Sequence, residues 1–141
     1  MARLQILTET YRTPGFTPVG NVLAGQVVEL VTASSIQAAA GDVVLGVALE
    51  GNVSFDDPSK YYDDINRGGL IGTTHGGIIT VAGDDRGAAF DVANIPALKG
   101  IVYWNKTTKL YTSVSAGGVR VGTCIKTASG ATDSLGIKLE I

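Results

Sequence analysis

The segment Leu135–Ile141, LGIKLEI, gives the clearest view of the fold. Its apolar side chains occupy alternate positions and therefore share one face of an extended strand, while Lys138 and Glu140 share the other. A period of two is typical of a strand that is buried on one side. We therefore expect a C-terminal strand whose apolar face lies in the core.

Other segments of the chain have the same character. They are short, rich in Val, Ile, Thr and aromatic residues, and bounded by Gly, Asp, Asn or Ser. These segments are Leu4–Leu7, Gln26–Val31, Val43–Leu49, Gly77–Val81, Ile101–Trp104, Leu110–Val114 and Val119–Ile125. The 19 glycines also favour tight turns and bulges over helices. The sequence predicts an all-β fold, a compact β-sandwich or barrel of about seven to nine short strands, with at most one or two short helical turns.

The chain contains a faint internal repeat. Gly25–Val28 and Gly100–Tyr103 begin two similar stretches, each followed by a run of small residues and then by a second strand. Gly46 and Gly122 occupy matching places in those second strands, where we expect a bulge or a close backbone to exclude a side chain. Each half then ends on a glycine-led strand, GIITV at Gly77 in the first half and GIKLEI at Gly136 in the second.

Residues 1–21 are expected to form an extended N-terminal arm. Pro14 and Pro18 stop a helix and remove backbone donors that a central strand would need. The arm is too apolar for a free solvated tail. Its apolar residues are Leu4, Ile6, Leu7, Tyr11 and Phe16. Two alternatives remain open for it, a first strand packed on its own domain or a contact with a neighbouring subunit.

The length of 141 residues suits one domain, which we place at 22–141. The first half of the repeat is longer because of an insertion at 52–76. We expect either an excursion loop or a short helical turn over Tyr61–Ile65, and a second brief turn at Asn94–Gly100. Long loops are often functional, so this insertion, with Tyr61 and Tyr62, is a second candidate contact surface.

Charge and hydropathy exclude several classes of partner. The net charge is −2, so the chain provides no positive field for phosphates, and we expect no nucleic acid partner. No apolar run approaches the ~20 residues that cross a bilayer, and the N-terminus lacks the layout of a signal peptide. We therefore expect no membrane partner, and synthesis in the cytoplasm.

Residues suited to catalysis are scarce. Cys124 is the sole cysteine and lies in a predicted strand, where a buried and inert thiol is usual. His75 is the sole histidine, in a glycine-rich loop without an acidic neighbour in sequence. Three Asp pairs match no EF-hand spacing and are expected to solubilise and cap, with a structural calcium at 56–64 as the alternative. We expect no enzyme, no cofactor and no metal site.

Five segments, taken in order, resemble the capsid cement (head decoration) proteins of tailed bacteriophages. The segments are Ala24–Val28, Gly41–Leu49, Gly77–Val81, Gly100–Trp104 and Gly136–Glu140. The likeness covers about residues 22–141, and the insertion at 52–76 departs from the shorter connection usual in that family. The resemblance implies a structural virion protein on the outer capsid surface that bridges major capsid protein subunits and stabilises the shell against internal pressure.

The resemblance also implies self-assembly, as a homotrimer rather than a dimer, with the major capsid protein as the other partner. Apolar residues make up 45% of the chain and charged residues 17%, against ~25% charged in an average soluble domain. We expect part of this apolar surplus to serve contacts with other subunits or with the capsid. The candidate contact residues are Leu4, Ile6, Leu7, Tyr11, Phe16, Tyr61, Tyr62 and Trp104.

The alternative function is a carbohydrate-binding or tail-associated β-sandwich, an adhesion module. Such a module needs exposed aromatic rings as a platform for sugars. Tyr61, Tyr62 and Trp104 are the candidates for that platform.

Overall fold

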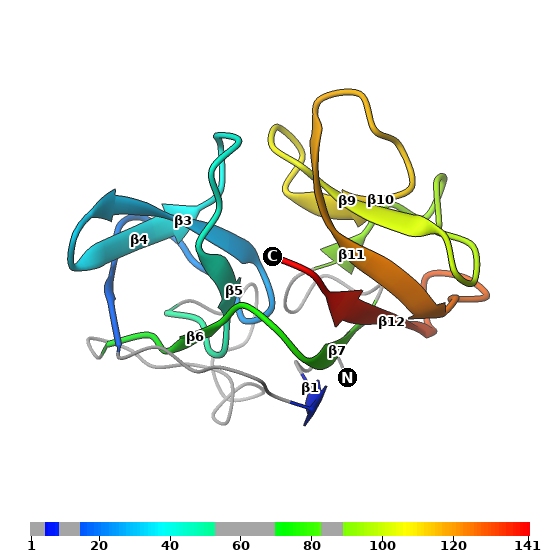
Figure 1. Cartoon of the computed structure of the whole chain (residues 1–141), viewed down its shortest axis with the longest axis horizontal. Helices are drawn as coiled ribbons and strands as arrows, with labels where there is room; N and C mark the ends of the chain where they lie inside the picture. Colours follow the sequence, from blue (N-terminus) through cyan, green and yellow to red (C-terminus); the bar gives the residue numbers. More distant parts are fainter. Residues whose placement is uncertain (1–4, 9–14, 53–69, 83–88) are drawn as a thin grey trace.

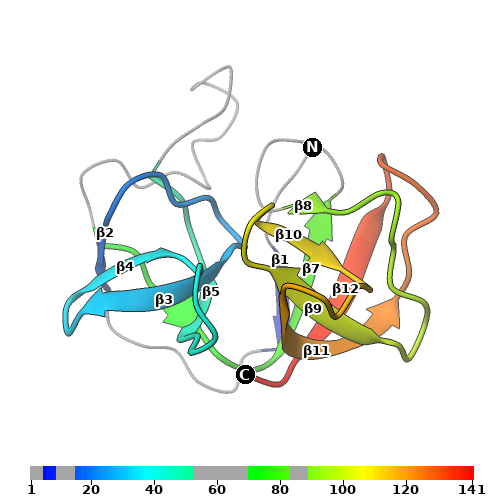
Figure 2. The same cartoon turned by 90° about the horizontal axis from the view of Figure 1, so that it is seen from above.

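The computed structural model describes residues 5–8, 15–52, 70–82 and 89–141, which form strands and turns without a helix. The predicted all-β fold is therefore confirmed. Twelve strands form two sheets, which appear as two lobes side by side in Figures 1 and 2. The prediction of seven to nine strands is too low, because four strands of two to four residues are too short to show a periodic pattern.

The first lobe is a five-stranded sheet in the order β2-β4-β3-β5-β6. Its strands are β2 (Thr17–Pro18), β3 (Val27–Thr32), β4 (Ser35–Ala38), β5 (Gly46–Ala48) and β6 (Thr73–Thr74). Phe16 and Ile71 precede the two edge strands and form a bridge in which each backbone N–H donates to the other residue's carbonyl oxygen, at 2.8 and 2.7 Å. This bridge closes the sheet into a small barrel.

The second lobe is a seven-stranded sheet in the order β1-β7-β12-β11-β9-β10-β8. Its strands are β1 (Gln5–Thr8), β7 (Ile78–Ala82), β8 (Ala89–Phe90), β9 (Ile101–Asn105), β10 (Leu110–Thr112), β11 (Gly118–Lys126) and β12 (Ser134–Leu139). The alternation predicted for the C-terminal strand is confirmed: Leu135, Ile137 and Leu139 are buried, while Lys138 is exposed.

The predicted arm contributes one strand to each lobe. β1 is the edge strand of the large sheet and pairs antiparallel with β7, and β2 pairs parallel with β4. The described parts of residues 1–21 thus lie in the sheets of the chain itself, the first of the two alternatives for this segment.

The two lobes share one topology of five strands. The order β2-β4-β3-β5-β6 in the first corresponds to β8-β10-β9-β11-β12 in the second. In both, the outermost pair is parallel and the other pairs are antiparallel. The register agrees as well, because Gly46 pairs with Val28 as Gly122 pairs with Val102. The predicted internal repeat is confirmed, but its predicted start is shifted by one residue, because Val28 matches Val102 and Gly25 therefore matches Lys99 rather than Gly100.

Backbone hydrogen bonds outside the ladders repeat in the same way. In the first lobe they run from Gly25 N–H to Ala48 O, Ala48 N–H to Gln26 O and Gln26 N–H to Leu23 O. In the second lobe they run from Lys99 N–H to Cys124 O, Cys124 N–H to Gly100 O and Gly100 N–H to Ala97 O. Gly25 and Lys99 also share a positive φ, 87° and 67°, so the second lobe retains the turn although it has lost the glycine that favours it.

The prediction for Gly46 and Gly122 is confirmed. A Cβ on Gly46 would overlap the carbonyl oxygen of Thr74, and one on Gly122 would overlap that of Lys138. The predicted equivalence of Gly77 and Gly136 is wrong. The contacts of Gly46 and Gly122 make Thr74 equivalent to Lys138, and two residues earlier the equivalent of Gly136 is Gly72.

The error arises because the two strands resemble each other only in residue type. β7, which contains the last four residues of GIITV, leaves the first lobe and pairs with β12 in the second, with Ile79 opposite Ile137. Figure 1 shows the chain crossing between the lobes from β6 to β7. The strand that ends the repeat in the first lobe is β6, which lies inside the predicted insertion at 52–76.

Two clusters of buried side chains form the core. The smaller lies within the first lobe and includes Val22, Val28, Ile36, Ala48 and Ile71. The larger fills the second lobe and also includes three first-lobe residues, Val27, Ala39 and Val47. The second lobe therefore completes its core with the outer side of the first.

Candidate functional site

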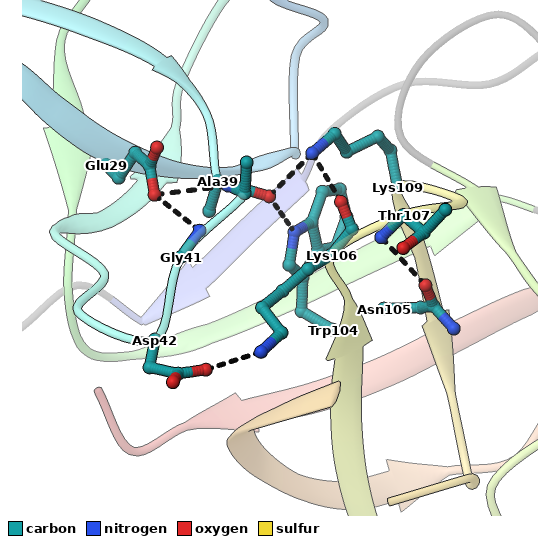
Figure 3. Close-up of polar contacts among 10 residues, drawn as sticks. Glu29, Ala39, Gly41, Asp42, Trp104, Asn105, Lys106, Thr107 and Lys109 are labelled. Carbon is teal, nitrogen blue, oxygen red and sulfur yellow. Dashed lines mark hydrogen bonds and ion pairs between the residues drawn. The ribbon is translucent and has the colours of Figure 1, made fainter. Parts of the chain in front are cut away.

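The junction between the lobes is organised around Trp104 on β9 (Figure 3). The indole is fully buried, and its Nε1–H donates to the carbonyl oxygen of Ala39 in the first lobe at 3.1 Å. Tyr111 on β10 packs against it edge to face, with ring centroids 5.2 Å apart. A buried indole N–H needs an acceptor, and a carbonyl of the other lobe provides it.

Tyr111 makes a second buried link between the lobes. Its hydroxyl donates to the carbonyl oxygen of Gly25 at 2.6 Å. Complete burial raises the pKa of the Tyr111 phenol far above its usual range, because the charged form would lie in an apolar environment. The hydroxyl is therefore protonated at neutral pH and can donate this hydrogen bond.

Two lysines of the hairpin between β9 and β10 close the junction at its rim (Figure 3). The Lys109 ammonium donates to Ala39 O at 2.9 Å and to Lys106 O, while Lys106 forms an ion pair with Asp42. Lys109 has a positive φ of 59°, a conformation that is costly for a side-chain-bearing residue. The strained turn thus places an ammonium on the same carbonyl that receives the Trp104 indole.

Glu29 fixes the first-lobe segment that receives these bonds. Its carboxylate accepts from the Gln37 side chain at 2.7 Å and from the backbone N–H groups of Ala40 and Gly41 at 3.1 and 2.7 Å. The carboxylate holds the turn after β4, so that the carbonyl of Ala39 faces the second lobe (Figure 3).

The structure places Trp104 in the interior. The sequence named Trp104 as a candidate contact with other subunits or with the capsid, and also as part of a sugar platform. Its complete burial within the chain leaves no exposed ring for the first role. A fully buried ring also offers no platform to a sugar. Trp104 is therefore an anchor between two lobes of one chain.

Of the other predicted contact residues, those that the structure describes do not lie together in one site. Phe16 is half-buried and packs against the small core. Ile6 and Leu7 lie on the edge strand β1. Leu4, Tyr11, Tyr61 and Tyr62 lie outside the described residues, as do the predicted turn at Tyr61–Ile65 and the Asp pairs 56–57, 63–64 and 84–85.

Sequence reasoning missed an apolar hollow on the first lobe. Leu30, Val43, Val44 and Leu45 line a cavity of about 310 Å³. Val43 is 87% exposed and Leu30 is 51% exposed. The run Val43–Leu45 was expected to begin a strand, but β5 begins only at Gly46. These three residues form a connection instead, in which Val43 is exposed while Val44 and Leu45 are half-buried.

The two residues considered for catalysis lie in different parts of the fold. Cys124 is buried, its thiol faces the Pro96 carbonyl oxygen at 3.6 Å, and burial raises the pKa of the thiol. A protonated, buried thiol is a poor nucleophile. His75 is half-buried in the turn between β6 and β7. Within the described residues, the His, Cys, Asp and Glu side chains form no group of three that could hold a metal ion.

The described part of the chain has no helix long and apolar enough to span a bilayer. Comparison with protein-family models and with curated proteins found no match to this chain.

Proposed function

We propose that this chain is a capsid cement protein, a structural virion protein without chemistry of its own. It binds the exterior of a tailed-phage capsid, bridges major capsid protein subunits and stabilises the shell against internal pressure. It acts as a homo-oligomer, with a trimer as the preferred form, and it resides on the outer capsid surface.

The five family-like segments carry this proposal. Each of them contributes to a strand of the frame described above, namely β3, β5, β7, β9 and β12. They therefore supply two inner strands of the first sheet, β3 and β5, and three inner strands of the second, β7, β9 and β12. The part that departs from the family, 52–76, lies between β5 and β7. A resemblance that follows the frame of the fold is more informative than one confined to loops.

The distribution of apolar side chains supports a protein that works through contacts. Large aliphatic side chains are exposed on both lobes, including Val43, Leu70, Val92 and Leu98. Val43 lies beside the exposed Leu30 in the hollow on the first lobe, and contiguous exposed apolar surface marks interaction sites. On a symmetric shell many copies bind together, so a modest contact for each copy is enough for stable attachment.

Capsid binding is the direct test. Purified protein is mixed with shells of the phage that encodes it, assembled without this chain, and co-sedimentation and the melting temperature of the shell are measured. We expect saturable binding and a rise in melting temperature. Shells of an unrelated phage are the control.

Absence of binding, with no gain in shell stability, would refute the proposal. The same preparation is applied to a glycan array. Binding to sugars and not to shells would identify the adhesion module instead.

A further inference from the structure

The contact between the lobes joins two different surfaces. In each central strand the side chains alternate between an inner face, directed into the lobe, and an outer face. On β3 the inner face includes Val28 and the outer face Val27, and their counterparts on β9 are Val102 and Ile101. Val27 and Ala39, on the outer face of the first lobe, belong to the same buried cluster as Trp104, which lies on the inner face of the second lobe.

Such a contact between unlike surfaces uses only one surface of each lobe. The inner end of the second lobe is covered, and the outer face of the first lobe covers it. Among the residues that the structure describes, the repeat therefore leaves two equivalent surfaces uncovered, the inner end of the first lobe and the outer face of the second.

The uncovered inner end is the apolar hollow. Val28 and Val102 are equivalent residues of the two lobes, and counting two residues on from each shows that Leu30 corresponds to Trp104. Counted from Gly46 and Gly122, Val43 and Leu45 correspond to Val119 and Val121. Trp104 and Val121 are fully buried, whereas Leu30 is 51% exposed and lines the hollow with Val43 and Leu45.

The uncovered outer face carries aliphatic residues at the matching positions. Ile101 corresponds to Val27, and it is 40% exposed where Val27 is fully buried. Ile36 and Tyr111 are equivalent residues of the two lobes, so Ala39 and Val114, three residues further on, also correspond. Val114 is 38% exposed. Ile125 on β11, on the same face as Ile101, is also 40% exposed.

We propose that a second copy of this chain covers the hollow, with the outer face of its second lobe repeating between molecules the contact that joins the lobes within one molecule. Residues Ile101, Val114 and Ile125 of one copy pack against Leu30, Val43 and Leu45 of the next. A contact between two different surfaces joins the copies head to tail. It produces a ring where the rotation from one copy to the next closes, and a linear chain of copies where it does not.

The contact between copies is weaker than the contact within the chain. The hairpin between β3 and β4 is Ala33-Ser34, which has no lysine to match Lys109, and Leu30 has no donor to match the indole. On the outer face of the second lobe, Thr123 stands where the first lobe has the buried Val47, and its hydroxyl donates to Glu140 at 2.7 Å. This polar centre keeps the face compatible with water before assembly.

Two variants test the proposal on the protein alone, independently of any capsid. V43D places a charge in the hollow, and V114D places one on the outer face. V92D is the matched control, since Val92 is 48% exposed and belongs to neither surface. Circular dichroism and thermal melting check that each variant is folded, and L30K and I125K provide a second pair. Sedimentation velocity is measured from low to high protein concentration.

We expect wild-type and V92D to associate as concentration rises, and V43D and V114D each to remain monomeric. A mixture of V43D and V114D should form a 1:1 complex, because the intact outer face of the first fits the intact hollow of the second. T123V should shift wild-type association to lower concentration. A monomeric wild-type protein, unimpaired variants, or a mixture that stays monomeric would each overturn the proposal. This inference rests on the self-assembly in the proposed function, and capsid binding is read separately. A chain that binds shells but does not associate with itself would overturn this contact without overturning capsid binding.

Discussion

The strands β3 and β9 occupy the same place in their lobes, yet their burial is reversed at both ends. Val27 is buried and Leu30 exposed on β3, whereas Ile101 is exposed and Trp104 buried on β9. The topology and hydrogen bonding are the same, so the strand itself does not decide which side chain is buried. The neighbouring lobe does, because it covers the outer face of one strand and the inner end of the other.

A second difference lies in how each sheet ends. The first lobe closes on itself through the bridge between Phe16 and Ile71. In the second lobe the residue equivalent to Ile71 is Leu135, which pairs with Val81 of β7. β7 and β1 therefore extend the second sheet where the first one closes, and the second lobe gains a larger core that needs the first lobe to complete it.

The largest effect should come from the reversed pair Trp104 and Leu30. Trp104→Ala removes a buried ring and its hydrogen bond to Ala39, and we expect it to lower the free energy of unfolding by about 3–5 kcal/mol. Leu30→Ala should cost less than about 1 kcal/mol, because this side chain is half exposed. Urea unfolding followed by circular dichroism, at a dilution where the chain is a single copy, measures both. Equal losses of unfolding free energy in the two variants would contradict the reversed burial of Trp104 and Leu30.

The paired glycines test the part that the lobes share. Gly46→Ala and Gly122→Ala each force a Cβ onto a backbone oxygen, of Thr74 and Lys138, and each should cost about 1–3 kcal/mol. The control is Gly130→Ala, since a Cβ there meets nothing within 4 Å and should change stability by less than about 1 kcal/mol. Thermal unfolding provides the measurement. Tolerance at only one of the two glycines would break the equivalence of the lobes.

The smallest effect concerns the turn between β11 and β12. The backbone N–H of Ser129, the Lys126 ammonium and the N–H of Ser134 hold the pKa of Asp133 well below its usual range. The pKa is lower in the folded protein, so this stabilisation is present above about pH 4 and is lost as the pH falls further.

The test compares wild-type with Asp133→Asn, which keeps the shape of the side chain and removes its charge. Asp133→Asn should have a slightly lower melting temperature than wild-type at pH 7. The difference should shrink as the pH is lowered from about 5 to 2. A difference that does not change with pH would show that the charge of Asp133 contributes nothing to this turn.

Much of the fold is present in local sequence patterns. Every strand of five or more residues overlaps a predicted segment, with ends that differ by one or two residues. Gly46 and Gly122 mark the repeat because steric exclusion leaves a glycine at both places. The two-residue strands β2, β6 and β8 are too short for a period of two to appear. Their existence depends on partners that are distant in sequence.

The candidate surfaces were harder to predict for the same reason. Trp104 was recognisable as a contact residue, but not as the contact of one lobe with the other. Val43 and Val119 have the same residue type and the same position in the repeat, and only the packing of the lobes makes their exposure differ. An apolar side chain reveals its role only when the surface beside it is known.

The crossing from β6 to β7 also determines the order in which the lobes can form. All five strands of the first lobe are made once Thr74 has been synthesised, whereas β1 waits for β7 and the large sheet is completed only with Leu139. Pairings between distant segments slow folding, and chains fold from the N-terminus as they are synthesised. The first lobe thus forms early and presents Val27, Ala39 and Val47 as a finished surface on which the second lobe assembles.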